Sequence, residues 1–101
     1  MAIVEVRISP LGIGNTSISK YVAECHKVLR EEKDLKYQLT PMATIIEGDL
    51  DKILAAIRKM HEVPFREGAG RVSTTIMIDD RRDKEATMEA KIASVEAKLK
   101  K

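Results

Sequence analysis

The sequence predicts an α+β fold in which two helices cover one face of a four-stranded antiparallel sheet. Two observations predict it. Segments whose apolar residues alternate with polar ones, typical of half-buried strands, are interleaved with segments whose apolar residues recur every third or fourth position, typical of amphipathic helices. The order of these segments along the chain is strand, helix, strand, strand, helix, strand.

The first strand is predicted over residues 2–9, where valine and isoleucine alternate with polar residues. Pro10 has no N–H to donate to a sheet, and the side-chain oxygens of residues 15–17 are suited to capping a helix. The first helix is therefore expected to begin there and to run to about Glu32. Its apolar stripe includes Cys25, which is expected to pack in the core.

Residues 36–48 are rich in strand formers, but Pro41 cannot occupy a central strand position. The segment is therefore expected to form two short strands that meet near Pro41. A second amphipathic helix should follow Gly48 and end at Pro64. The alternating pattern of residues 71–78 predicts the last strand.

This order is the split βαβ pattern, so the predicted fold is a ferredoxin-like βαββαβ sandwich forming one domain, residues 1–101. A further helix is expected from about Asp83 to Lys101. Its apolar residues alternate at four- and three-residue spacing, typical of contact between helices. They are Met88, Ile92, Val95 and Leu99. A second copy of the chain is the expected partner, giving a homodimer or homotetramer.

Charge and cysteine content narrow the classes of function. Basic and acidic residues are mixed along the chain and leave a net charge of +2, so neither nucleic acid nor a membrane is expected as a partner. No apolar stretch approaches the roughly 20 residues that span a bilayer. One cysteine permits no intramolecular disulfide, so the cytoplasm is the expected location.

Catalytic groups and metal ligands are not evident in the sequence. His26 and His61 lie on different predicted helices without other ligands at metal-binding spacing. Cys25 is expected to be buried, which raises the pKa of a thiol and disfavours the nucleophilic thiolate. The sequence therefore predicts no enzyme, no metal and no required cofactor.

The sheet face opposite the two helices should carry the polar residues of each strand. Alternation assigns to this open face Glu5, Arg7, Ser9, Gln38, Thr40, Thr44, Ser73, Thr75 and Met77. It assigns to the covered face Val4, Val6, Ile8, Val72, Ile76 and Ile78. A solvated sheet face shows the same alternation. Enclosure by a second subunit would instead create a small-molecule site there.

Three stretches carry a resemblance to a known family. They are Pro10-Leu11-Gly12, the run from Tyr37 to Gly48, and Arg71-Val72 together with Ile78 to Arg81. Together they resemble the short, YkoF-related members of the thiamine-binding protein family. The resemblance implies a ferredoxin-like fold, dimers that pair into tetramers, and binding of thiamine or its hydroxymethylpyrimidine portion without known catalysis.

The resemblance also implies ligand-binding residues. Carried over position by position, they are Ser9, Gly12, Thr40, Met42, Thr44 and Glu47. Sheet alternation adds Ser73 and Thr75. A thiazolium cation would favour a nearby carboxylate, either Glu5 or Glu47.

Two alternatives stay open. The chain could be a structural or regulatory homo-oligomer without a small ligand. It could also be a small acyl-phosphate hydrolase that uses Arg7 or Arg71 to bind the anion.

Overall fold

A computed structural model describes residues 1–12, 14, 19–84 and 87–100. The elements follow the predicted order and are joined by a third helix at the end. They are β1 (Ala2–Leu11), α1 (Ser19–Arg30), β2 (Lys36–Leu39), β3 (Thr44–Gly48), α2 (Leu50–Arg66), β4 (Arg71–Asp80) and α3 (Met88–Leu99). The predicted cap of the first helix, residues 15–17, lies outside the described residues.

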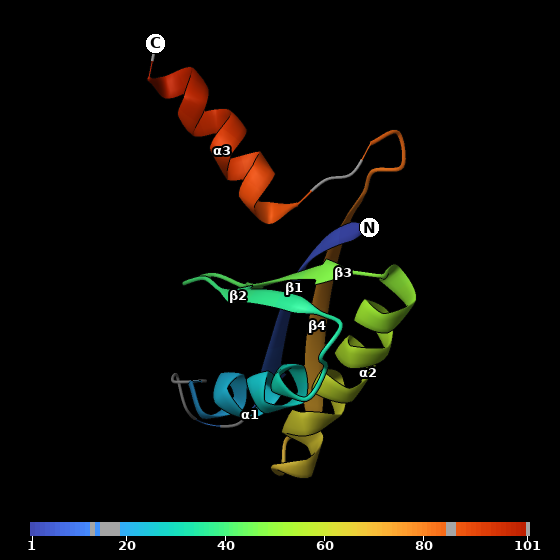
Figure 1. The fold of residues 1–101 in the computed structure, drawn as a ribbon. Coiled ribbons are helices and arrows are strands. Elements are labelled where there is room, and N and C mark those ends of the chain that lie inside the picture. Colours follow the sequence, from blue (N-terminus) through green and yellow to red (C-terminus); the bar gives the residue numbers. More distant parts are fainter. Residues whose placement is uncertain (13, 15–18, 85–86, 101) are drawn as a thin grey trace.

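The four strands form one antiparallel sheet in the order β2-β3-β1-β4. Helices α1 and α2 lie together on one face of it, as Figure 1 shows. The register places Val4 opposite Ile46 on β3 and Ile78 on β4. The ferredoxin-like prediction is therefore confirmed, with the additional C-terminal helix.

The core lies between this sheet face and the two helices. Even-numbered residues of β1 face it, because Ala2, Val4 and Val6 are almost fully buried. The helices contribute their apolar stripes, among them Leu29 of α1 and Ile53 of α2. Aliphatic side chains thus fill the interior of a chain that has few aromatic residues.

The prediction that Pro64 ends the second helix is wrong, because α2 continues to Arg66 with Pro64 buried inside it. A proline within a helix cannot donate to the carbonyl four residues earlier, which here belongs to Met60. The Cys25 thiol of α1 lies 3.5 Å from this carbonyl and donates to it. A contact between the two helices thus replaces part of the missing backbone bond.

The covered face extends less far than predicted. Ile76 and Ile78 do lie on the helix side of β4, but they are 40% and 45% exposed. Because β4 is an edge strand, α2 covers it only in part. His61 of α2 reaches Thr74, with 2.7 Å between Nδ1 and Oγ1. Because Ile76 and Ile78 are exposed to this extent, they form an apolar edge of the sheet and are not part of the core.

Helix α3 starts against the opposite, open face of the sheet and projects away from the body (Figure 1). It begins at Met88, five residues later than predicted at Asp83, where Thr87 caps it by accepting from the Ala90 N–H at 3.0 Å. Met88 is buried, whereas Val95 is 58% exposed. Only the first member of the predicted stripe therefore packs within the chain.

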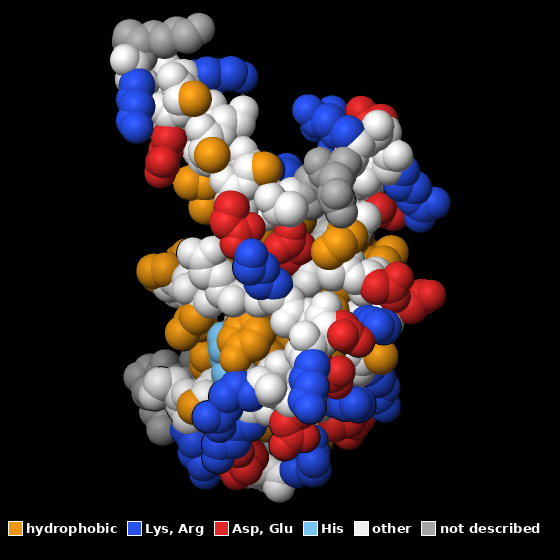
Figure 2. Space-filling model, in the orientation of Figure 1, with side chains coloured by type: hydrophobic (Ala, Val, Ile, Leu, Met, Phe, Trp, Pro, Cys, Tyr) orange, Lys and Arg blue, Asp and Glu red, His pale blue; other side chains and the backbone are white. Residues whose placement is uncertain are grey.

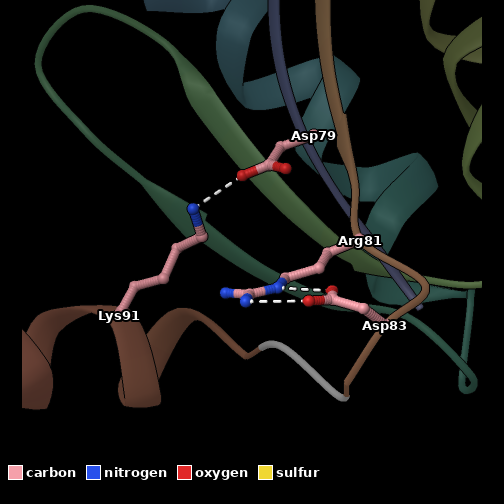
Figure 3. A network of polar contacts seen from close by, with 4 residues as sticks. All are labelled: Asp79, Arg81, Asp83 and Lys91. Carbon is pink, nitrogen blue, oxygen red and sulfur yellow. Dashed lines mark hydrogen bonds and ion pairs between the residues drawn. The ribbon is translucent and has the colours of Figure 1, made fainter.

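Two ion pairs hold the first turns of α3 to the sheet. Glu89 pairs with Lys36 on the β2 edge, and Lys91 pairs with Asp79 on β4 at 2.6 Å. Figure 3 shows the latter contact beside the pair formed by Arg81 and Asp83. Lys36 and Asp79 belong to one row across the four strands, so the start of α3 spans the full width of the open face.

Candidate ligand-binding site

A cavity of about 570 Å³ lies between α1 and the hairpin of β2 and β3, on the helix side of the sheet. Its lining residues are Val6, Arg7, Ile8, Ser9, Ser19, Val22, Ala23, His26, Leu39, Thr40, Pro41, Met42, Ala43 and Thr44. Sites for small molecules typically have this size, with mainly apolar walls and a few polar groups. The cavity is therefore the candidate site.

The turn between β2 and β3 forms the rim of the cavity, and Thr40 shapes this turn. Its hydroxyl donates to the Ala43 carbonyl at 2.8 Å and accepts from the Ala43 N–H at 3.0 Å. The Met42 N–H approaches the same oxygen at 3.4 Å. These bonds hold Met42 at the rim with its side chain 76% exposed. Thr40 thus contributes to the site by fixing the turn.

A histidine–threonine pair provides the main polar feature of the inner wall. Nε2 of His26 lies 2.9 Å from Oγ1 of Thr44, and the imidazole edge meets the ring of Tyr37 at 5.5 Å between centroids. Burial lowers the pKa of His26 below its ordinary value, which favours the neutral imidazole. A neutral ring donates through one nitrogen and accepts through the other.

Figure 2 shows a histidine side chain among apolar side chains in the region between α1 and β2. Around this region the same view shows many charged side chains of both signs, blue for lysine and arginine and red for aspartate and glutamate. A polar group framed by apolar walls fixes the orientation of a ligand whose remaining surface is buried by the hydrophobic effect.

The structure brings four of the predicted site residues to the cavity: Ser9, Thr40, Met42 and Thr44. Of these, Ser9 alternates with Ile8, so its side chain belongs to the opposite face of β1. Gly12 is exposed just beyond the end of β1, with φ of 71°, and does not line the cavity.

The prediction that Thr44 lies on the open face is wrong. Thr44 pairs with Val6 of β1 and with Leu39 of β2, and it is nearly buried on the helix side. The register of β3 places Thr44 and Ile46 on the same side. This correction is what moves the candidate site from one face of the sheet to the other.

Three predicted residues do lie on the open face, namely Glu5, Ser73 and Thr75. Glu5 is half-buried, whereas Ser73 and Thr75 are exposed on the edge strand. None of them lines any of the described cavities. Their role in binding stays a prediction.

Glu47 is the remaining predicted residue, and only 3% of its surface is exposed. It lies in the sheet row that the start of α3 spans, between Lys36 on β2 and Ile3 on β1. Its Oε1 is buried and has no hydrogen-bond partner in the described part of the chain. Burial of an unpaired polar atom costs free energy, and the attraction between this carboxylate and Lys36 offsets part of that cost.

His26 is not among the binding residues predicted from the sequence, where it is considered only as a metal ligand. His26 follows the buried Cys25, and Val22 lies one turn earlier, so the position of His26 at the margin of the apolar stripe indicates that its side chain is partly buried.

Among the described residues, no group of three or more His, Cys, Asp or Glu side chains is arranged to hold a metal ion. No helix in those ranges is long and apolar enough to cross a membrane.

The chain is thus a small α+β domain with a cavity of the size that small-molecule sites have. Comparison with known proteins gives the family. The family described as "Thiamine-binding protein" matches residues 4–96, so the chain belongs to this family.

Relatives cover nearly the full length of the chain. The UPF0045 protein YqgV of Bacillus subtilis (strain 168) is 51% identical over an alignment of 102 positions that covers 98% of each chain. The UPF0045 protein of Methanothermobacter thermautotrophicus is 37% identical over 100 residues, covering 98% of this chain and all of the relative. The resemblance seen in the sequence is thus confirmed in bacteria and archaea.

Solved structures agree with the fold. The hypothetical protein MJ1052 of Methanocaldococcus jannaschii matches with a TM-score of 0.83 and 39% identity over 93% of this chain and 94% of that one. A Thermotoga maritima protein provisionally assigned to thiamine biosynthesis or salvage matches with a TM-score of 0.74 over 93% and 97% of the two chains. At 17% identity, the second match supports the fold alone.

Proposed function

We propose that this protein binds thiamine or its hydroxymethylpyrimidine portion in the cavity between α1 and the β2–β3 hairpin, without catalysing a reaction. The observation that carries the proposal is the His26–Thr44 pair in the wall of an otherwise mainly apolar cavity. Membership of the thiamine-binding family supplies the class of ligand. The volume of the cavity is in the range of sites for molecules of this size.

The pyrimidine fits the chemistry of the inner wall. An aminopyrimidine offers hydrogen-bond donors and acceptors on one edge, and the histidine–threonine pair offers both in return. The apolar side chains from β1 and α1 can cover the ring faces. Because burial favours the neutral form of the His26 imidazole, a cationic ligand meets little repulsion from it.

The thiazolium of thiamine finds less support in the cavity. Glu5 lies on the other face of the sheet, and Glu47 is buried away from the cavity. The two carboxylates predicted to meet the cation are therefore not available to a ligand bound at His26. We infer that the pyrimidine enters the cavity and that the thiazolium, when present, points to the open rim.

Isothermal titration with thiamine, its phosphate esters and hydroxymethylpyrimidine tests the proposal. Saturable binding is expected at micromolar concentrations, with hydroxymethylpyrimidine keeping most of the affinity of thiamine. The variant His26→Ala should bind at least tenfold more weakly, because the ligand loses a partner in a desolvated wall. Absence of heat from the folded protein with every compound would overturn the proposal.

Self-association is a second proposal, and it rests on the exposed stripe of α3. Ile92, Val95 and Leu99 are all more than half exposed, and they follow Met88, which is buried. An apolar helix face left without cover in a single chain is suited to a second copy of that chain. A structural or regulatory homo-oligomer without a small ligand is the alternative function that this stripe supports.

Light scattering at micromolar concentration measures the assembly. We expect the mass of a dimer or a tetramer, and a lower mass for Val95→Glu, because a charge would be buried in the contact. A monomeric mass for the unchanged protein would exclude the proposal. The cytoplasmic location and the absence of catalysis stay predictions.

A further inference from the structure

A second, smaller hollow of about 30 Å³ adjoins the large cavity on its inner side. Both hollows are lined by Val6, Ile8, Val22, His26 and Thr44. The smaller one continues beyond them to Cys25 on α1 and Met60 on α2. We call it the inner chamber. The His26–Thr44 pair lies at the boundary between the two spaces.

The far wall of the inner chamber is apolar and uncharged. Cys25 is buried there, its thiol donates to the Met60 carbonyl, and burial raises the pKa of this thiol to about 11. The hydroxyl of Thr44 and the ring of His26 already bond to each other. A water molecule needs two to four polar partners, so this chamber is poorly suited to water.

The size of the inner chamber selects what can enter. A space of this volume holds one group about as large as a water molecule, and a methyl group is of that size. Filling it with a methyl removes apolar surface from water without breaking the existing hydrogen bonds. A longer alkyl group would meet Cys25 and Met60, whose neighbours in the core are closely packed.

The pyrimidine of thiamine carries both an amino group and a methyl group on its ring carbons. A ring that bonds to His26 and Thr44 through its nitrogen atoms lies at the mouth of the inner chamber. We propose that the inner chamber is a size-selective subsite that receives the ring methyl, with Cys25 and Met60 setting its depth. This inference rests on the proposed function, since it assumes that the ring binds at the histidine–threonine pair.

A matched series of ligands tests the inference by isothermal titration. The series is 4-amino-5-hydroxymethylpyrimidine carrying hydrogen, methyl or ethyl at ring carbon 2. For the unchanged protein, the methyl compound should bind about tenfold more tightly than the hydrogen compound, which is the usual effect of one methyl group in an apolar pocket. The ethyl compound should bind more weakly than the methyl compound.

Two variants change the chamber in opposite directions. Cys25→Ala enlarges it, so the ethyl compound should bind as tightly as the methyl compound or more tightly. Val22→Leu, at a half-buried position of α1, fills it, so the methyl compound should lose its advantage over hydrogen. Ile53→Val is the control, because Ile53 is fully buried but lines neither hollow. It should leave the order of the three compounds unchanged.

The outcomes separate the two proposals. If none of the compounds binds the unchanged protein, the proposed function fails and this inference fails with it. If the compounds bind but hydrogen, methyl and ethyl are equivalent, only the inner chamber is overturned. The same holds if Cys25→Ala and Val22→Leu both keep the order of the unchanged protein. Val22 is half-buried, so Val22→Leu is expected to fold. This variant therefore tests the inner chamber even if Cys25→Ala does not fold.

Discussion

The two faces of the sheet differ in what covers them. On the helix face, α1 and α2 bury aliphatic side chains but leave a cavity where α1 meets the β2–β3 hairpin. The open face carries exposed polar residues at Ser73 and Thr75, and the start of α3 covers one end of it. Polar residues alone therefore do not mark a site. A polar pair can bind a ligand where helices shield it from solvent and still leave a cavity beside it.

Matched threonine variants on the two faces give the largest expected difference. Thr44→Val removes a nearly buried hydroxyl from the cavity and leaves His26 without its partner, so affinity for hydroxymethylpyrimidine should fall at least tenfold. Thr75→Val changes an exposed residue of the open face and should alter affinity less than about twofold. Calorimetry of both variants decides between the faces. A loss confined to Thr75→Val would move the site back to the open face.

The buried carboxylate of Glu47 is the weak point of the open face. Glu47→Gln removes the cost of burying a charge whose Oε1 has no hydrogen-bond partner in the described residues. We expect this gain to exceed the lost attraction to Lys36, so the free energy of unfolding should rise by about 1 kcal/mol. Glu5→Gln, at a half-buried position of the same face, should change it by less than about 0.5 kcal/mol. Urea unfolding measures both. A clear loss of stability in Glu47→Gln would mean that the carboxylate has a stabilising partner.

The pH dependence of stability sharpens the account of the helix face. Burial lowers the pKa of His26 in the folded protein below its unfolded value of 6.5, so the unfolded chain binds the proton more readily. The contribution of His26 to the free energy of unfolding is fully present above pH 6.5. It is lost as the pH falls below 6.5 toward the lowered pKa of the folded protein. In His26→Gln, this part of the pH dependence should be absent. Identical pH profiles for the two proteins would contradict the desolvated position of His26.

The ion pairs that hold α3 to the open face should give the smallest effect. Lys36 and Lys91 are exposed, as are their partners Glu89 and Asp79. Replacing either lysine with alanine should lower the free energy of unfolding only slightly, and less in high salt. Thermal unfolding at low and high salt measures this. A loss as large as that caused by a substitution in the core would show that α3 is an integral part of the fold.

The fold could be predicted from the sequence because each element carries a clear period. Valine and isoleucine alternate in β1, and the stripes of α1 and α2 repeat at helical spacing. The end of α2 could not be predicted, since the contact from Cys25 to the Met60 carbonyl that accompanies Pro64 is tertiary. The exposure of Ile76 likewise depends on how far α2 reaches across the edge strand.

The candidate site could be predicted only in part. Ser9, Thr40, Met42 and Thr44 were found through the family resemblance, and all four border the cavity. The face of Thr44 was assigned wrongly because Thr44, Ile45 and Ile46 show no alternation that fixes their sides. The pairing of Thr44 with Val6 is what fixes the side of the sheet on which Thr44 lies. His26 was missed because a cavity depends on the space that neighbouring helices leave unfilled, which no local pattern encodes.

The central claim is that the ligand binds on the helix face of the sheet. Amide chemical shifts recorded by NMR during titration with hydroxymethylpyrimidine test this claim most directly, because both faces are observed at once. The largest shifts are expected at His26, Ala43 and Thr44, with little change at Thr75 and Met77. Saturable shifts concentrated at Thr75 and Met77, with His26 and Thr44 unaffected, would contradict it.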